Sequence, residues 1–283
     1  SMNGYVRILL IVCLCTIGRA ALAEHACEVS RSADPDSAVL ILQDDRVVVQ
    51  CGPVNTVRVI ASASKSLSGL ALALLEQQGR LRATDFVAPY MPAGWGVEGR
   101  ERIRVHHLAT MSSGLIPQDG FSTYEQITTQ GMLFPPGARW YYASLPVDII
   151  SLVVKRITGV HLSTYLNTHL FRKIGIGNIT WGTFSGYPRG CCSARATAWQ
   201  LAKLGTFLLD DGVYNGHRLL SSTAMRRISK YALTLSDDVF FSNPIMPLHR
   251  FQEKNYAWLW WLNRTGHILG NGLFNLGQFV GNG

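Results

Sequence analysis

The sequence lacks the short motifs that usually identify hydrolytic, nucleotide-binding and metal-binding sites. It contains no Gly-x-Ser-x-Gly elbow, no P-loop and no His-Glu-x-x-His pair. Its cysteines form no Cys-x-x-Cys pair and no cysteine–histidine spacing typical of a metal site. The glycines of residues 94–99 match the dinucleotide-binding pattern formally, but prolines precede them and no helix follows, which predicts a loop. We therefore expect no metal and no cofactor.

Charged residues are also scarce. They make up 16% of the 283 residues against 47% hydrophobic residues, a balance typical of a globular protein with a sizeable core. No internal repeat or low-complexity tract interrupts the chain. The formal net charge is +8, but the basic residues are scattered and include no run of five. The sequence therefore predicts no nucleic-acid partner.

A hydrophobic run long enough to span a bilayer is missing as well. Residues 8–17 are apolar, but a transmembrane helix needs about 20 such residues. Arg7 precedes this run, and Ala21-Leu22-Ala23 fits the small-residue rule for signal cleavage. We predict a signal peptide over residues 1–23 and an exported chain, periplasmic or secreted, without a stable membrane span. An N-terminal membrane anchor is the alternative.

Four cysteines remain after removal of that segment. Cys27 and Cys51 flank a predicted hairpin, and we expect them to form a disulfide in an oxidising compartment. Cys191 and Cys192 are adjacent in the sequence. Because a disulfide between neighbours is strained, we expect one or both of these thiols to stay buried and free.

The order of predicted elements is strands, a long helical section, then strands. Residues 38–43 and 46–51 form β-rich runs around Asp44-Asp45, and residues 256–263 and 273–280 are the later candidate strands. Helices are predicted over residues 62–79, 103–114, 146–158, 163–174 and 196–210, with another capped by Ser221 or Ser222.

This order predicts an α+β fold in which an antiparallel sheet is built from both chain ends, with flanking helices and a mostly helical lobe. We expect a single domain over residues 24–283. Its α/β lobe would comprise residues 24–80 and about 191–283, and its helical lobe about 81–190. A cleft between the lobes is the expected site.

The helix predicted from Ser62 to Gly79 carries the first candidate chemistry. Lys65 lies one turn after Ser62, so its amine can reach the serine hydroxyl. A helix N-terminus also favours the negative charge that a serine nucleophile develops. The same four residues are equally typical of a serine N-cap followed by a solvated lysine. His106 and His107 invite a catalytic role too, but adjacent residues point apart on a helix, which favours structural roles.

A second motif gives the serine–lysine pair its context. The stretch Ser62-Ala-Ser-Lys65 opens a Leu/Ala-rich helix, and Pro-Gly-x-x-Trp-x-Tyr142-Ala-Ser144 follows later. Together they resemble the serine β-lactamase and penicillin-binding-protein superfamily. The nearest branch comprises class C β-lactamases, family VIII carboxylesterases and 6-aminohexanoate-oligomer hydrolases. Residues 106–115, 191–205 and 259–263 resemble this branch as well.

The resemblance implies roles for individual residues. Ser62 would be the acylated nucleophile, and Lys65 and Tyr142 would take its proton and return one to the leaving group. Which of the two is the base stays open. Ser144 stands where class C enzymes carry asparagine, as a substrate-binding position. One oxyanion donor would be the backbone N–H of Ser62, and the second would lie on a C-terminal strand.

That strand should carry the third motif of the superfamily. Arg264-Thr265-Gly266 resembles Lys-Thr-Gly, and Asn275-Leu276-Gly277-Gln278 resembles the His-x-Gly-Gln form. From the second match, Asn275, Gly277 and Gln278 are the candidate substrate-binding residues. The sequence ends at Gly283, where the resemblance implies a further strand and a closing helix.

The function implied is an exported serine hydrolase that cleaves an ester or amide through an acyl-enzyme on Ser62. Its substrate would be a small ester, a β-lactam, a D-alanyl or peptidoglycan-like peptide, or an amide oligomer. Ser144 and the uncertain third motif favour an esterase or amidase over an efficient β-lactamase. The alternatives are a non-catalytic or slowly acylated relative that recognises penicillin or the cell wall, and a truncated, inactive fragment.

Overall fold

The structure is a computed structural model that describes residues 20–21, 23–32, 35–116, 124–230, 233–234, 255–262, 268–271 and 278–280. It divides into two compact units, residues 1–57 with 197–203 and residues 58–196 with 204–283. No helix within the described ranges is long and apolar enough to cross a membrane. Most of the predicted signal peptide lies outside the described residues and stays a prediction.

The first unit contains the predicted hairpin. Strand β1 (Val39–Gln43) pairs antiparallel with β2 (Arg46–Cys51). Asp44 and Asp45 form the turn with φ of +49° and +59°, the left-handed pair that a two-residue hairpin turn requires and that aspartate tolerates. The predicted disulfide between Cys27 and Cys51 is confirmed, with 5.4 Å between the two Cα atoms.

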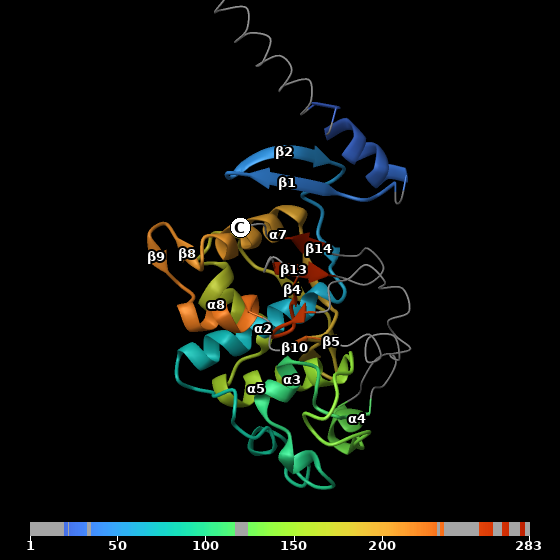
Figure 1. The fold of residues 1–283 in the computed structure, drawn as a ribbon, viewed down its shortest axis with the longest axis vertical. Helices are drawn as coiled ribbons and strands as arrows, with labels where there is room; N and C mark the ends of the chain where they lie inside the picture. The colour runs from blue at the N-terminus through green and yellow to red at the C-terminus, as the bar shows by residue number, and fades with distance from the viewer. Residues whose placement is uncertain are drawn as a thin grey trace, which may run out of the picture. The chain divides into compact units, whose positions relative to one another are not determined.

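Helix α2 (Ala63–Gln77) is the centre of the second unit. Every residue from Ala63 to Leu75 is buried, because α2 packs against α5 (Leu145–Thr158), α6 (Leu162–Leu166) and α8 (Ser222–Ser229) (Figure 1). Each fully buried leucine contributes roughly 1.5–3 kcal/mol to folding. Helix α5 ends at Gly159 with φ of +78°, and Ser221 caps α8 by accepting the Ala224 N–H, both as predicted.

Other predicted helices are shorter than expected. The helix expected over 103–114 is α3 (Val105–Ala109), because Met111 has φ of +56° and the chain leaves the helix there. The segment expected over 163–174 divides into α6 and a π-helical turn, η3 (Asn167–Phe171). Further helical elements are α4 (Tyr124–Thr129), α7 (Ala198–Leu209), η1 (Ala88–Tyr90) and η2 (Arg100–Arg102), and residues 23–32 of the first unit are helical as well.

The described strand pairs are all antiparallel, which agrees with the predicted α+β class. A five-stranded sheet has the order β10 (Leu233–Thr234), β11 (Asn255–Tyr256), β12 (Trp261–Leu262), β13 (Ile268–Asn271) and β14 (Gln278–Val280). A second sheet has the order β3 (Arg58–Val59), β7 (Ala194–Ala196) and β4 (Thr180–Trp181). Two hairpins join β5 (Thr183–Phe184) to β6 (Tyr187–Pro188) and β8 (Val213–Tyr214) to β9 (His217–Arg218). In the described pairings, the strands of the two chain ends belong to separate sheets.

The single strand expected over residues 256–263 is wrong. The chain forms β11 and β12 with a tight turn between them, in which Leu259 has φ of +63°. Long-range contacts hold this turn, since the Leu259 N–H donates to the Ala109 carbonyl (2.9 Å) and Ser66 Oγ donates to the Leu259 carbonyl (2.9 Å). Of the strand expected over 273–280, residues 278–280 form β14 and the others lie outside the described residues.

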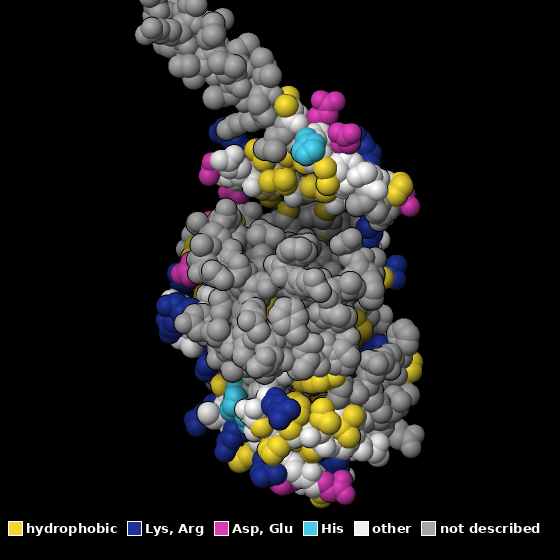
Figure 2. Space-filling model, turned by 45° about the vertical axis from the view of Figure 1, so that its right-hand side comes forward, with side chains coloured by type: hydrophobic (Ala, Val, Ile, Leu, Met, Phe, Trp, Pro, Cys, Tyr) yellow, Lys and Arg dark blue, Asp and Glu magenta, His cyan; other side chains and the backbone are white. Residues whose placement is uncertain are grey.

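Figure 2 shows Lys and Arg side chains at several places on one face, among hydrophobic, acidic and histidine side chains.

Candidate active site

Ser62 lies where the chain passes from β3 into helix α2. The residue before it, Ala61, has φ of +43°, a conformation that an alanine adopts only when its surroundings enforce it. Ser62 itself is in the helical region, and its side chain makes no capping hydrogen bond to the start of α2. Ser62 thus occupies the N-cap position of α2, but its hydroxyl does not cap the helix. The side chain is 6% exposed.

Lys65 is buried against Ser62. Its Nζ lies 3.1 Å from Ser62 Oγ and donates at 2.9 Å to the carbonyl of Cys191. The side chain is only 2% exposed, so the alternative of a solvated lysine is wrong. An amine held at these two distances has one N–H engaged by the carbonyl and faces the serine hydroxyl, which is the geometry of a base beside a nucleophile.

Tyr142 reaches the same amine from the segment before α5. Its ring centroid lies 4.8 Å from Lys65 Nζ, and the side chain is 4% exposed. Trp261 stacks on this ring at 6.2 Å, and Trp140 and Tyr256 pack beside Trp261. Burial, and next the nearby Tyr142, raise the pKa of Tyr256 well above its ordinary value, so this phenol stays protonated at neutral pH.

Among the other predicted site residues, the structure describes the side chain of Ser144 alone. Ser144 is the residue immediately before α5, half-buried, with no capping bond to that helix. Asn275 and Gly277 lie outside the described residues, and so does the competing motif at 264–266. Gln278 begins β14, where the structure describes the backbone only. The structure thus brings together Ser62, Lys65 and Tyr142.

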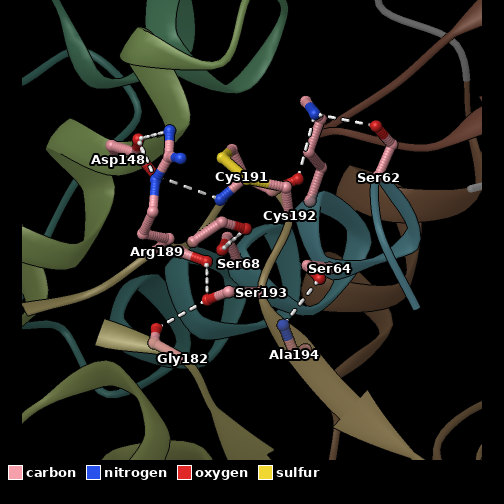
Figure 3. The surroundings of a disulfide bond; sticks show 12 residues. Ser62, Ser64, Ser68, Asp148, Gly182, Arg189, Cys191, Cys192, Ser193 and Ala194 are labelled. Carbon is pink, nitrogen blue, oxygen red and sulfur yellow. Dashed lines mark hydrogen bonds and ion pairs between the residues drawn. A yellow bond between two sulfur atoms is a disulfide. The ribbon is translucent and has the colours of Figure 1, made fainter. Parts of the chain in front are cut away.

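Sequence reasoning included residues 191–205 in the resemblance but missed that the segment of residues 189–194 lies along α2 and contacts it (Figure 3). Three contacts fasten it: Ser68 Oγ donates to the Gly190 carbonyl (3.0 Å), Lys65 Nζ to the Cys191 carbonyl, and the Ala194 N–H to Ser64 Oγ (3.0 Å). The serines at every second position of the predicted helix were a signal for these contacts. Ser64, Ser66 and Ser68 are buried and bond to the backbone, whereas Ser62 bonds to Lys65 Nζ.

The expected free thiol at Cys191 or Cys192 is wrong, because the structure joins the two residues by a disulfide. Their Cα atoms are 3.8 Å apart in a tight turn, where the N–H groups of Cys192 and Ser193 both donate to the Arg189 carbonyl (3.4 Å each). Cys191 is buried as expected.

The two histidines hold the backbone around α3. His106 Nδ1 contacts the Ala83 carbonyl (2.9 Å), and His107 Nδ1 accepts the Arg104 N–H (3.0 Å). Burial, and then the charges of His106 and Arg104, lower the pKa of His107 from 6.5 to about 4, so its ring is neutral. In the described part of the chain, no three His, Cys, Asp or Glu side chains cluster as a metal site would require.

Comparison with known proteins places this geometry in a family. The profile of the Beta-lactamase family matches residues 28–234. The 6-aminohexanoate-dimer hydrolase of Paenarthrobacter ureafaciens is 26% identical over 248 residues, which cover 76% of this chain and 60% of that protein. A Salmonella schwarzengrund protein named "Putative D-alanyl-D-alanine carboxypeptidase" is 22% identical over 182 residues, 50% of this chain and 42% of its own length.

A solved structure supports the same fold. The penicillin binding protein from Bacillus halodurans matches with a TM-score of 0.65 over 86% of each chain, at 18% identity. This chain therefore spans roughly half the length of the curated relatives it matches (60% and 42%), and most of a solved structure of the fold. With the family profile covering most of the sequence and a buried serine–lysine–tyrosine group at its centre, the chain belongs to the beta-lactamase family of serine hydrolases.

Proposed function

We propose that this protein cleaves a small ester or amide through an acyl-enzyme formed on Ser62. The observation that carries the proposal is the 3.1 Å contact between Lys65 Nζ and Ser62 Oγ in a buried site that also contains Tyr142. An exposed serine–lysine pair would be hydrated and would not indicate catalysis. In this buried pair, the Lys65 amine has hydrogen bonds with the serine hydroxyl and with a backbone carbonyl.

The proposed reaction has two halves. In its neutral form the Lys65 amine donates one N–H to the Cys191 carbonyl and accepts the Ser62 proton with its lone pair. Ser62 Oγ then bonds to the substrate carbonyl carbon, and the bond to the leaving alcohol or amine breaks as that group takes a proton from Lys65 or Tyr142. In the second half, water bonds to the acyl carbon, gives up one proton, and Ser62 Oγ leaves with a proton restored.

The proposed substrate class is based on the names of two relatives and on the residue at position 144. The relatives reported above are named 6-aminohexanoate-dimer hydrolase and "Putative D-alanyl-D-alanine carboxypeptidase", and the compounds in both names contain amide bonds. We infer an amide oligomer, a D-alanyl peptide or a small ester as the substrate. Ser144 has a shorter side chain than the expected asparagine and cannot supply an amide contact, which favours these over efficient β-lactam hydrolysis.

We also infer that the protein is exported to the periplasm or secreted, with residues 24–283 as the mature domain. The disulfide between Cys27 and Cys51 supports this, since disulfides persist in oxidising compartments.

The test uses intact-mass spectrometry after exposure to a fluorescent penicillin and to p-nitrophenyl butyrate. The wild-type protein should gain one acyl group and hydrolyse the ester, and Ser62→Ala should do neither. Ser66→Ala is the matched control, because it removes a buried hydroxyl from the same helix that bonds only to the Leu259 carbonyl.

Equal turnover by wild type and Ser62→Ala, with no covalent adduct, would overturn the proposal. A stable penicillin adduct on Ser62 without ester turnover would instead assign the protein to penicillin recognition.

A further inference from the structure

Asp148 is hydrogen-bonded to Cys191, the residue whose carbonyl accepts a hydrogen bond from Lys65. It is on the first turn of α5, six residues after Tyr142, and it is buried. Its Oδ1 accepts the N–H of Cys191 at 3.3 Å. The N–H of Cys191 is thus held by Asp148 and its carbonyl by Lys65, so one backbone residue connects the carboxylate to the amine (Figure 3).

Arg189 fixes the other carboxylate oxygen. Its Nη2 and Nε both donate to Asp148 Oδ2, at 2.9 and 3.2 Å. Both side chains are almost fully buried, 5% exposed for Asp148 and 7% for Arg189. A buried ion pair is weak evidence for stability, because desolvation offsets the attraction between the charges. The position of the pair beside the Cys191 N–H points instead to a role in geometry.

The surroundings leave the backbone little freedom to adjust. A Cβ atom on Gly190 would lie 2.8 Å from both Ser68 Oγ and the Val147 carbonyl, so this residue fits tightly between α2 and α5. The N–H of Cys191 belongs to the peptide between Gly190 and Cys191, which is held by Asp148 at this N–H and by Ser68 at the Gly190 carbonyl. The carbonyl of Cys191 belongs to the next peptide, and the two peptide planes are joined at the Cα of Cys191. Loss of the Asp148 bond therefore lets the first plane tilt and changes the direction of the carbonyl toward Lys65.

We propose that Asp148 and Arg189 are positioning residues for acylation, which hold the Cys191 carbonyl so that it orients the Lys65 amine toward Ser62. This inference rests on the proposed function, because it concerns the same acylation step. A misplacement of about 1 Å at a catalytic group can lower a rate by about 100-fold. We expect a loss of about 10- to 100-fold in the acylation rate when the pair is broken.

The first variant is Asp148→Asn, which conserves size. Both carboxylate oxygens accept hydrogen bonds, but an amide has one acceptor oxygen, so its NH2 must face either Cys191 N–H or Arg189. The acylation rate by p-nitrophenyl butyrate should fall about 10- to 100-fold, mainly in kcat, with KM changed less than about threefold.

A second pair of variants separates charge from shape. Both Arg189 bonds end on one oxygen, so the single ammonium of Arg189→Lys can replace them, whereas Arg189→Met cannot. Arg189→Lys should stay within about threefold of wild type and Arg189→Met should lose as much as Asp148→Asn. The double variant Asp148→Asn/Arg189→Met should lose no more than either alone, since the two residues act as a unit.

The matched control is Glu76→Gln. Glu76 makes a similar ion pair with Arg227, with two hydrogen bonds of 2.7 and 2.8 Å. It lies on α2, as Lys65 does, but 11 residues later, which is about 16 Å along the helix axis. This control should lower stability without changing kcat.

Two results would overturn the inference: a kcat for Asp148→Asn within threefold of wild type, or equal losses for Arg189→Lys and Arg189→Met. If Asp148→Asn does not fold, the comparison of Arg189→Lys with Arg189→Met tests the inference. Absence of any acylation of the wild-type protein would overturn the proposed function and this inference with it. Acylation of wild type with no effect of these variants would overturn the inference alone.

Discussion

Two glycines in helix interiors should respond to alanine with opposite signs. Alanine is favoured over glycine in a helix by about 1 kcal/mol. Gly205 in α7 has open space where a Cβ would lie, so Gly205→Ala should stabilise the protein by up to that amount. At Gly69 in α2, a Cβ would lie 2.2 Å from the carbonyl oxygen of Trp258.

The contact at Gly69 cannot relax cheaply, because the Trp258 carbonyl belongs to the backbone of the turn that Ser66 and Ala109 fix through Leu259. Overpacking costs about 1–3 kcal/mol, and an approach of 2.2 Å to a backbone oxygen places Gly69→Ala in the upper part of that range, at about 2–3 kcal/mol. After the helix gain of about 1 kcal/mol, the net loss is about 1–2 kcal/mol. For a protein of this size, 1 kcal/mol shifts Tm by about 2–4 °C.

The assay is thermal unfolding followed by circular dichroism for wild type and both variants. We expect Gly205→Ala to melt about 2–4 °C above wild type and Gly69→Ala about 2–8 °C below it. A Gly69→Ala protein with a Tm equal to or above wild type would refute the packing of α2 against the turn between β11 and β12.

Two further predictions concern His107 and the first disulfide. Because the folded-state pKa of His107 is lowered from 6.5 to about 4, its contribution is complete above pH 6.5 and is lost as the pH falls toward 4. After discounting for partial exposure, the free energy of unfolding from urea titrations should fall by about 1–2 kcal/mol over that pH range in wild type, and by less in His107→Asn. An equal fall in both proteins would contradict the lowered pKa of His107. Cys51→Ser opens the loop to Cys27, 24 residues away in sequence, and should destabilise the hairpin by about 3 kcal/mol. Faster amide exchange in β1 and β2 would report this loss, and unchanged exchange would argue against the disulfide.

The sequence was most informative where local rules decide structure. The Asp44-Asp45 turn, the stop at Gly159 and the Ser221 cap each depend on residues within a few positions of one another, and each is confirmed. Ser62 and Lys65 likewise meet because they share one helix face. Tyr142 joins them across the fold, and only the resemblance to a known family could predict that.

The rest depended on contacts that no local pattern encodes. The turn at Leu259 exists because α2 and α3 bond its backbone, which overrides the strand preference of its aromatic neighbours. Asp148 and Arg189 are 41 residues apart and match no motif spacing. The partner of Lys65 is a main-chain carbonyl, and any residue type at position 191 would supply one.

The hydrogen bonds from α2 to main-chain atoms have a consequence for which substitutions the protein tolerates. Lys65 and Ser66 of α2 bond to the main-chain oxygens of Cys191 and Leu259, and Ser64 accepts a main-chain N–H from Ala194. Through these three residues, helix α2 bonds to the main chain of its neighbours and not to their side chains. Random mutagenesis should accordingly find Lys65 more intolerant to change than Ala194, whose main-chain N–H any residue except proline would supply.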